Sequence, residues 1–94
     1  MKPSFSLGNV IATPAVIAFS DTHPVDLAKL LARHQSGDCC DEGGLSADEI
    51  LANLDAILTG KGRIFSSYDI GPQRIWIITE ADRSLTTIML PEDH

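Results

Sequence analysis

Three runs of β-branched and aromatic residues follow one another in the last third of the chain, between Arg63 and Leu90. Short breaks separate them, at Gly71-Pro72-Gln73 and around Asp82-Arg83-Ser84. Proline presets one backbone angle and glycine permits unusual ones, so the first break suits a turn. Short strands joined by short turns are typical of an antiparallel meander. The middle run, Ile75-Trp76-Ile77-Ile78, is apolar throughout and therefore predicts the central strand, with Trp76 in the core.

The first third of the chain begins with a short β-prone run, Asn9 to Ala12, which predicts an N-terminal edge strand. Thr13-Pro14 follows with the signature of a helix start, and a short helix is predicted from Ala15 to Phe19. A strand is the alternative there, because the segment contains β-branched residues. A second helix is predicted from Pro24 to His34. Its apolar face has helical spacing and comprises Leu27, Leu30, Leu31 and His34.

A third helix is predicted after an acidic, glycine-rich loop, Gln35 to Gly44. Ser46 and Glu49 have the spacing of a capping box, in which each side chain satisfies a free backbone amide. Gly60 supplies the C-terminal stop. The helix carries an apolar stripe that predicts its core-facing side, namely Ile50, Leu51, Leu54, Ile57 and Leu58. Asp48, Asn53 and Asp55 fall largely on the other side.

The order of these elements predicts an α+β fold. Two or three N-terminal helices pack on a small antiparallel sheet, which consists of the C-terminal three-stranded meander and the N-terminal edge strand. Residues 1–94 are predicted to form a single domain, near the small end at which one core is self-sufficient. Homodimerisation through an exposed strand edge or the isoleucine-rich sheet face is therefore one hypothesis.

The net charge of −6 is concentrated in one segment. Between His34 and Gly60 there is no Lys or Arg, and the acids there are Asp38, Asp41, Glu42, Asp48, Glu49 and Asp55. An acidic surface repels phosphate backbones, so direct nucleic-acid binding is not expected. The segment instead predicts a protein partner with a basic surface, including one that normally holds nucleic acid. The alternative is a solvated helix face that keeps the protein in solution.

Two clusters of reactive residues are candidate sites. Cys39 and Cys40 lie near His34, but adjacent cysteines rarely both face one ion, and the chain lacks a second cysteine pair. We therefore expect no metal and no cofactor, and the surrounding acids disfavour a catalytic thiolate. Glu80, Asp82 and Arg83 follow the middle strand and, with His34, form a candidate ligand site. Local turn contacts and an ion pair are the alternative for these residues.

The chain contains no phosphate-cradling glycine loop, nucleophile elbow or zinc-binding helix motif. No catalytic residue is assigned, and a binding role is favoured over an enzyme. No apolar run approaches the ~20 residues that span a bilayer, so no membrane association is expected. The N-terminus, Met1 to Ser4, is a poor secretory signal, and we expect a cytoplasmic protein.

Three segments, Val10 to Pro14, Arg33 to Asp38 and Trp76 to Glu92, resemble a family of small proteins carried on bacterial plasmids and integrative elements. Members are often labelled plasmid-related protein or "type I restriction endonuclease subunit M". The resemblance covers nearly the whole chain, and the ending ITEADRSLTTIMLPE is its most specific part. The chain is too short for the Rossmann-like domain of a methyltransferase. The resemblance therefore implies a mobile-element setting without an established activity.

The chain departs from the family pattern after Asp38, where relatives tend to have Trp-Gly and this chain has Cys39-Cys40. This difference argues against a family-wide metal site. The leading hypothesis is a non-enzymatic protein-binding module of a mobile element, acting as an acidic inhibitor of a host restriction or CRISPR protein. One alternative is a homodimeric accessory protein. The other is a small-ligand-binding protein or enzyme that uses His34, Asp38, Glu80, Asp82 and Arg83.

Overall fold

Strands β2 (Ile64–Ile70), β3 (Gln73–Thr79) and β4 (Leu85–Met89) form the antiparallel meander expected of the last third. The computed structural model describes residues 5–39 and 45–93. The β2–β3 hairpin turns at Gly71-Pro72, and Gln73, expected in the turn, is the first residue of β3. Gly71 has a φ of 60°, which suits the first central position of a type II′ turn, and the second position tolerates proline.

Strand β1 (Asn9–Ala12) lies at the sheet edge, next to β4, and the strand order is β1-β4-β3-β2. The two strands run parallel, with Asn9 opposite Leu85 and Ala12 opposite Ile88. The sheet is therefore mixed, and the antiparallel arrangement expected for the whole sheet applies only to the meander. The parallel direction is possible because the connection from β1 to β4 is long and contains three helices and two strands. The α+β fold itself is confirmed.

Helix α1 (Pro14–Thr22) starts where the sequence indicates and extends three residues beyond the predicted end. The Thr13 hydroxyl oxygen accepts a hydrogen bond from the backbone N–H of Val16, and Pro14 occupies the first helical position. The same hydroxyl donates to Oδ2 of Asp93 at 2.7 Å, in the short 3-10 helix η1 (Pro91–Asp93). The start of α1 is thus tied to the end of the meander.

Helix α2 (Leu27–Gln35) begins three residues later than predicted. The Asp26 carboxylate accepts a hydrogen bond of 3.1 Å from the backbone N–H of Lys29 and is therefore the N-cap. A carboxylate is a strong N-cap and interacts favourably with the positive end of the helix. The predicted start at Pro24 was wrong because this cap, two residues further on, sets the boundary.

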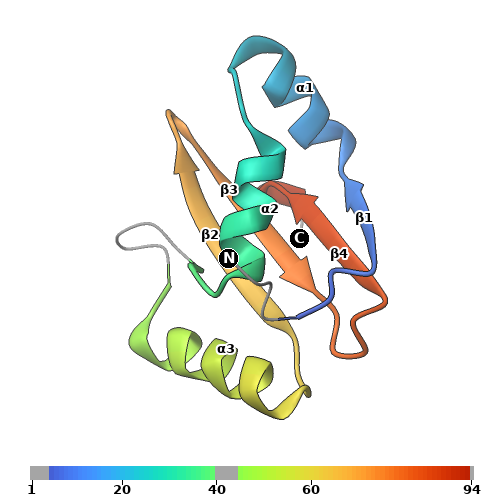
Figure 1. Cartoon of the computed structure of the whole chain (residues 1–94). Coiled ribbons are helices and arrows are strands. Elements are labelled where there is room, and N and C mark those ends of the chain that lie inside the picture. The colour runs from blue at the N-terminus through green and yellow to red at the C-terminus, as the bar shows by residue number, and fades with distance from the viewer. Residues whose placement is uncertain (1–4, 40–44, 94) are drawn as a thin grey trace.

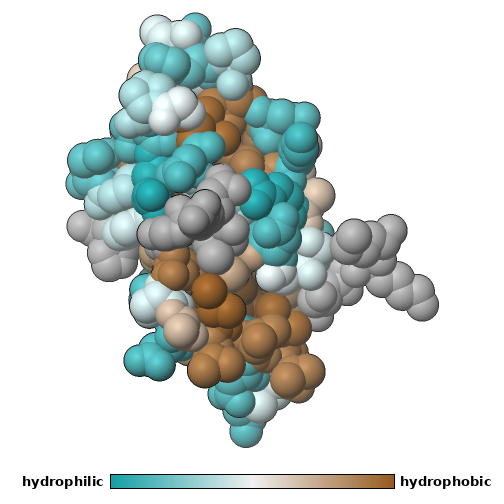
Figure 2. Space-filling model, turned by 90° about the vertical axis from the view of Figure 1, so that its left-hand side faces the viewer, coloured by the Kyte–Doolittle hydropathy of each residue, from teal (hydrophilic) through white to brown (hydrophobic). Residues whose placement is uncertain are grey.

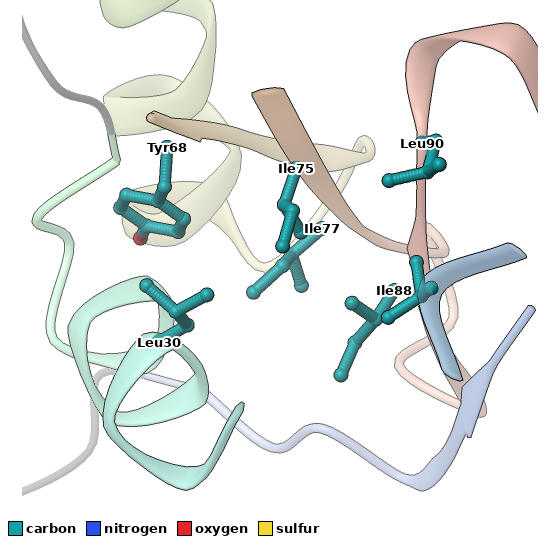
Figure 3. Packing of buried hydrophobic residues seen from close by; sticks show 7 residues of the cluster. Leu30, Tyr68, Ile75, Ile77, Ile88 and Leu90 are labelled. Carbon is teal, nitrogen blue, oxygen red and sulfur yellow. The ribbon is translucent and has the colours of Figure 1, made fainter. Parts of the chain in front are cut away.

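The hydrophobic core lies between α2, α1 and one face of the sheet. Figure 1 shows α2 crossing the sheet, with α1 above it and α3 (Ala47–Thr59) beside β2. Leu30 of α2 points toward the sheet residues in Figure 3. The buried cluster consists of Val16, Leu30, Tyr68, Ile75, Ile77, Ile88 and Leu90.

Trp76 lies outside this buried cluster, contrary to the prediction. It alternates with Ile75 and Ile77 along β3, so its side chain is on the opposite face of the sheet. There the indole is half-buried and packs edge-on against Phe65, with ring centroids 4.9 Å apart. Helices α1 and α2 cover the opposite face of β3, and on the Trp76 face the neighbouring Ile78 is 2% exposed.

Candidate functional site

Helix α3 is built as the sequence predicts at both ends. The Ser46 hydroxyl accepts from the backbone N–H of Glu49 at 3.2 Å, and the Glu49 carboxylate accepts from the backbone N–H of Ser46 at 3.0 Å. This reciprocal pair is the predicted capping box. Gly60 ends the helix with a φ of 71°, a left-handed conformation that glycine adopts without a Cβ penalty.

The side of α3 that faces the sheet has the polar residue Asn53 at its centre, and the leucines of the predicted stripe are not on this side. Asn53 is buried, and its side-chain amide bonds the backbone of Phe65 in edge strand β2. Its Nδ2 donates to the Phe65 carbonyl, and its Oδ1 accepts from the Phe65 N–H at 2.9 Å. Asn53 therefore satisfies two outward-facing groups of an edge strand, which leaves fewer groups free for another strand. This contact, together with buried Ala56, sets the orientation of the helix.

The three leucines of the predicted apolar stripe face outward as a result, whereas Ile50 and Ile57 are half-buried. Leu51, Leu54 and Leu58 are 63%, 48% and 84% exposed. They follow i, i+3, i+7 spacing and form one face of the helix. Figure 2 shows hydrophobic residues gathered at the lower end of the molecule, where Figure 1 places α3. The prediction that these leucines enter the core was wrong, because Asn53 occupies the inner side.

Acidic residues border the exposed leucines. Asp48 and Asp55 are exposed and lie three and four residues from Leu51, on the same side of the helix. Glu49 is exposed but also serves the capping box. Asp38 lies outside α3 and pairs with Arg33, with 2.7 Å between Oδ2 and Nε. Asp41 and Glu42, the other acids of the predicted segment, lie outside the described residues. We call Asp48, Leu51, Leu54, Asp55 and Leu58 the α3 face.

His34 lies in a buried polar network beneath α2. Its Nδ1 contacts the Ser66 hydroxyl, and its Nε2 lies 2.8 Å from Oγ1 of Thr79. The Thr79 and Thr86 hydroxyls are 2.8 Å apart, and the Thr86 hydroxyl donates to the Leu7 carbonyl at 2.7 Å. His34, Ser66, Thr79 and Thr86 are all 0% exposed. The network joins α2, three strands and the N-terminal segment.

The direction of these hydrogen bonds fixes the imidazole tautomer. Each hydroxyl has one hydrogen to donate, and Thr86 gives its hydrogen to Leu7. Thr86 therefore accepts from Thr79, and Thr79 accepts from the Nε2–H of His34. The remaining ring nitrogen, Nδ1, then accepts from Ser66. The imidazole is neutral and fully bonded, and burial lowers its pKa to about 4.

The other predicted ligand residues make separate local contacts. Glu80 pairs with Arg63, with 3.6 Å between Oε1 and Nε. Asp82 accepts hydrogen bonds from the backbone N–H and the hydroxyl of Ser84, which lower its pKa. A shallow depression of about 380 Å³ is lined by Glu80, Ala81, Asp82, Ser84 and Leu85. His34 and Arg83 are not among its lining residues, and His34 is fully buried in its network with Ser66 and Thr79.

Arg83 connects the β3–β4 turn to the end of α3. Its Nη2 donates to the Ala56 carbonyl at 2.9 Å, and its Nη1 donates to the Gly62 carbonyl at 2.7 Å. Nη1 also contacts the carbonyls of Glu80 and Ala81 within its own turn. The guanidinium thus places a positive charge at the negative end of a helix that has no basic residue in its last turn. These contacts are structural.

Arg83→Lys is expected to lower the free energy of unfolding by about 1–2 kcal/mol, because an ammonium group cannot reach all these carbonyls as the planar guanidinium does. Urea denaturation of the two proteins measures the difference. Arg63→Lys is the matched control, since its ion pair is exposed and is worth less than about 1 kcal/mol. Equal losses in the two variants would contradict the connecting role of Arg83.

A second depression, of about 210 Å³, lies between α3 and the sheet. Its lining comprises Glu49, Ala52, Asn53, Arg63, Phe65 and Ile78. The floor is apolar, from Phe65 and Ile78, and two charged groups stand at the rim. The α3 residues that line it do not belong to the α3 face. The depression is large enough for one side chain of a bound partner.

Among the described residues, no three His, Cys, Asp or Glu side chains gather closely enough to hold a metal ion. Cys39 is half-buried, and its carbonyl accepts from the Ser67 N–H at 2.8 Å. Cys40 lies outside the described residues. In residues 5–39 and 45–93, no helix combines the length and hydrophobicity that a membrane crossing requires.

The residues that sequence reasoning missed are the polar ones. Asn53 was expected on the side of α3 opposite the apolar stripe, and Ser66, Thr79 and Thr86 were not singled out. Each lies within a predicted helix or strand, and a polar residue that such an element buries must find hydrogen-bond partners. That requirement is the signal that could have found them, but their partners come from distant parts of the chain.

Comparison of the chain with protein-family models, with curated proteins and with solved structures gave no significant match.

Proposed function

We propose that the protein is a non-enzymatic protein-binding module that presents the α3 face to a partner. The observation that carries this proposal is the outward orientation of Leu51, Leu54 and Leu58, which are 63%, 48% and 84% exposed. Leucines at i, i+3, i+7 positions are the anchors of helices that bind in apolar grooves. Exposing three of them on one helix is unfavourable in water unless a partner covers them.

The acids of the α3 face determine the chemistry of the partner. Asp48 and Asp55 flank the leucines, and no Lys or Arg occurs between His34 and Gly60. A matching groove would therefore have an apolar floor and a rim of Lys or Arg. In such an interface the buried leucines supply most of the affinity, while rim charges increase the association rate and the specificity.

The resemblance to mobile-element proteins suggests which partners to test first. Restriction and CRISPR effectors hold nucleic acid on basic surfaces. A small protein with net charge −6 could occupy such a surface and exclude the nucleic acid. We therefore propose a host defence protein as the partner and inhibition by competition as the mechanism.

Tagged protein is expected to capture a basic defence protein from a lysate of bacteria that carry restriction and CRISPR systems. Leu54→Ser is expected to weaken the binding of the purified partner about tenfold or more, because it removes an anchor. Asp48→Asn with Asp55→Asn should mainly reduce the association rate and flatten its dependence on salt. Surface plasmon resonance at several salt concentrations measures both effects.

Two matched variants serve as controls. Ile17→Ser removes an exposed apolar side chain from α1, and Asp21→Asn removes an exposed acid from the same helix. Both should bind like the wild type. Glu49 is left unchanged because its carboxylate caps α3. The proposal would be contradicted if the α3 variants bound the partner as well as the wild type does. It would also be contradicted if the control variants lost binding to the same extent as the α3 variants.

A further inference from the structure

A second group of exposed apolar side chains lies in a different part of the molecule. Val10 and Ile11 of β1 are 42% and 50% exposed, and Ile17 of α1 is also exposed. This group and α3 lie at opposite edges of the sheet, because β1 is one edge strand and α3 packs on β2, the other edge strand. Figure 1 shows this separation.

The charges around the two groups differ. The α3 face belongs to a stretch with six acids and no bases. Positions 3 to 20, which include β1 and most of α1, contain no charged residue at all. Edge strands are normally protected against pairing by charged side chains, prolines or bulges. Strand β1 has exposed Val10 and Ile11 in place of such protection.

Within the part of the chain that the structure describes, one side of the β1 backbone has no hydrogen-bond partner. The N–H groups of Asn9 and Thr13 donate to the carbonyls of Ser84 and Ile88 in the β4 direction, each at 3.0 Å. Backbone groups alternate in direction along a strand, so those of Val10 and Ala12 point away from β4. Figure 1 shows the outer edge of β1 uncovered by the labelled helices, with α1 beyond the end of the strand.

We propose that β1 is a self-association surface and pairs antiparallel with β1 of a second copy. Val10 of each copy then lies opposite Ala12 of the other, and all outward N–H and C=O groups of these residues are bonded. Ile11 faces its own equivalent on the two-fold axis, with Cα atoms about 4.5 Å apart. Two four-stranded sheets become one continuous sheet.

The charge distribution favours a second copy over other occupants. Two molecules of net charge −6 repel each other, and the repulsion is smallest when they meet through their uncharged segments. A basic partner would find no acid in positions 3 to 20 to attract it. This arrangement leaves both α3 faces at the outer ends of the dimer. The inference therefore does not depend on the proposed function of α3.

Sedimentation velocity over a wide concentration range tests self-association. The wild type is expected to form dimers, and Ile11→Lys should raise the dimer dissociation constant about tenfold or more, because two lysines would meet on the axis. Ile11 is half-exposed, so the variant should still fold, and circular dichroism checks this. Leu58→Lys, the same type of change on α3, should leave the dimer unchanged. A wild type that stays monomeric would overturn the proposal, as would a dimer dissociated by Leu58→Lys alone.

Disulfide trapping tests the register. In a Cys39→Ser, Cys40→Ser background, Ile11→Cys should give a covalent dimer under mild oxidation, since the expected Cα separation of about 4.5 Å allows a disulfide. Leu58→Cys should give far less. Trapping at position 58 and not at 11 would overturn the β1 pairing. Capture of the partner should depend on Leu54 and not on Ile11, so this proposal and the proposed function fail in different variants.

Discussion

Lowering the pH from 7 to 4 is expected to destabilise the protein by about 3 kcal/mol through His34 alone. Burial holds the pKa of the folded His34 at about 4, compared with 6.5 for an ordinary histidine. The unfolded chain therefore binds a proton first as the pH falls, and the free energy of unfolding decreases between pH 6.5 and pH 4. The difference of 2.5 pKa units corresponds to about 3 kcal/mol. Stability is fully present above pH 6.5.

Urea denaturation at a series of pH values measures this dependence, and a variant assigns it to the residue. His34→Gln should lower stability at pH 7, because it disturbs the bonds to Ser66 and Thr79, but it should remove most of the loss between pH 6.5 and 4. His23→Gln is the matched control, since His23 is exposed, and it should keep the wild-type dependence. An unchanged pH profile in His34→Gln would show that other groups cause the acid destabilisation.

Local signals in the sequence were sufficient to predict the helices, the strands and the fold class. The Ser46–Glu49 capping box, the Thr13-Pro14 helix start and the Gly71-Pro72 turn depend on neighbouring residues, and the structure contains all three. Their chemistry acts within one helical turn or one hairpin. The start of α2 was predicted at Pro24, but the Asp26 carboxylate caps the helix two residues further on. The parallel direction of β1 has no local signal at all.

The apolar stripe of α3 was identified correctly, but its direction was not. Periodicity shows that a helix has an apolar side, and burial of that side is then assumed. In this protein the amide of Asn53 meets the backbone of Phe65, twelve residues away. A side-chain amide can both donate and accept a hydrogen bond and therefore matches the N–H and C=O groups of an edge strand. That match depends on tertiary placement, which no spacing in the sequence encodes.

The predicted ligand site illustrates the same limit. Reactive side chains near one strand end were expected to converge, yet Arg83 reaches the carbonyls of Gly62 and Ala56, 21 and 27 residues earlier in the chain. His34 was recognised as part of the α2 face, but its partners lie on strands 32 and 45 residues later. Buried polar groups require partners, and the partners determine whether such a residue is structural or free to react.

The N-terminal segment contacts both His34 and Arg83, because it passes over the β3–β4 turn before it enters the sheet. Phe5 packs edge-on against the His34 ring, and the Arg83 guanidinium lies over the Phe5 ring. Gly8 then brings the chain to β1. A Cβ at Gly8 would lie 2.4 Å from the Arg83 carbonyl oxygen and 2.5 Å from backbone atoms of Ser84. Backbone atoms cannot move aside as a flexible side chain can, so only glycine fits.

Gly8→Ala is therefore expected to lower the free energy of unfolding by about 2–5 kcal/mol, one of the largest effects of any single methyl group in this chain. Two costs add: the left-handed φ of 64° is unfavourable for alanine, and the overlap forces β1 away from β4. Gly71→Ala is the matched control, because its φ is 60° but nothing lies within 4 Å of its Cβ position. It should cost only about 1–2 kcal/mol.

Thermal and urea denaturation of the two variants separate these costs. The cost of the left-handed φ applies to both variants, whereas the steric overlap with Arg83 and Ser84 applies only to Gly8→Ala. Displacement of β1 should also weaken the proposed dimer, because the same strand provides its interface. Sedimentation of Gly8→Ala under conditions in which it remains folded tests this link. Equal losses of stability in Gly8→Ala and Gly71→Ala would show that the segment around Gly8 can move away from the Arg83 and Ser84 backbone without a cost in stability. In that case β1 would be held less tightly against β4 than its hydrogen bonds indicate.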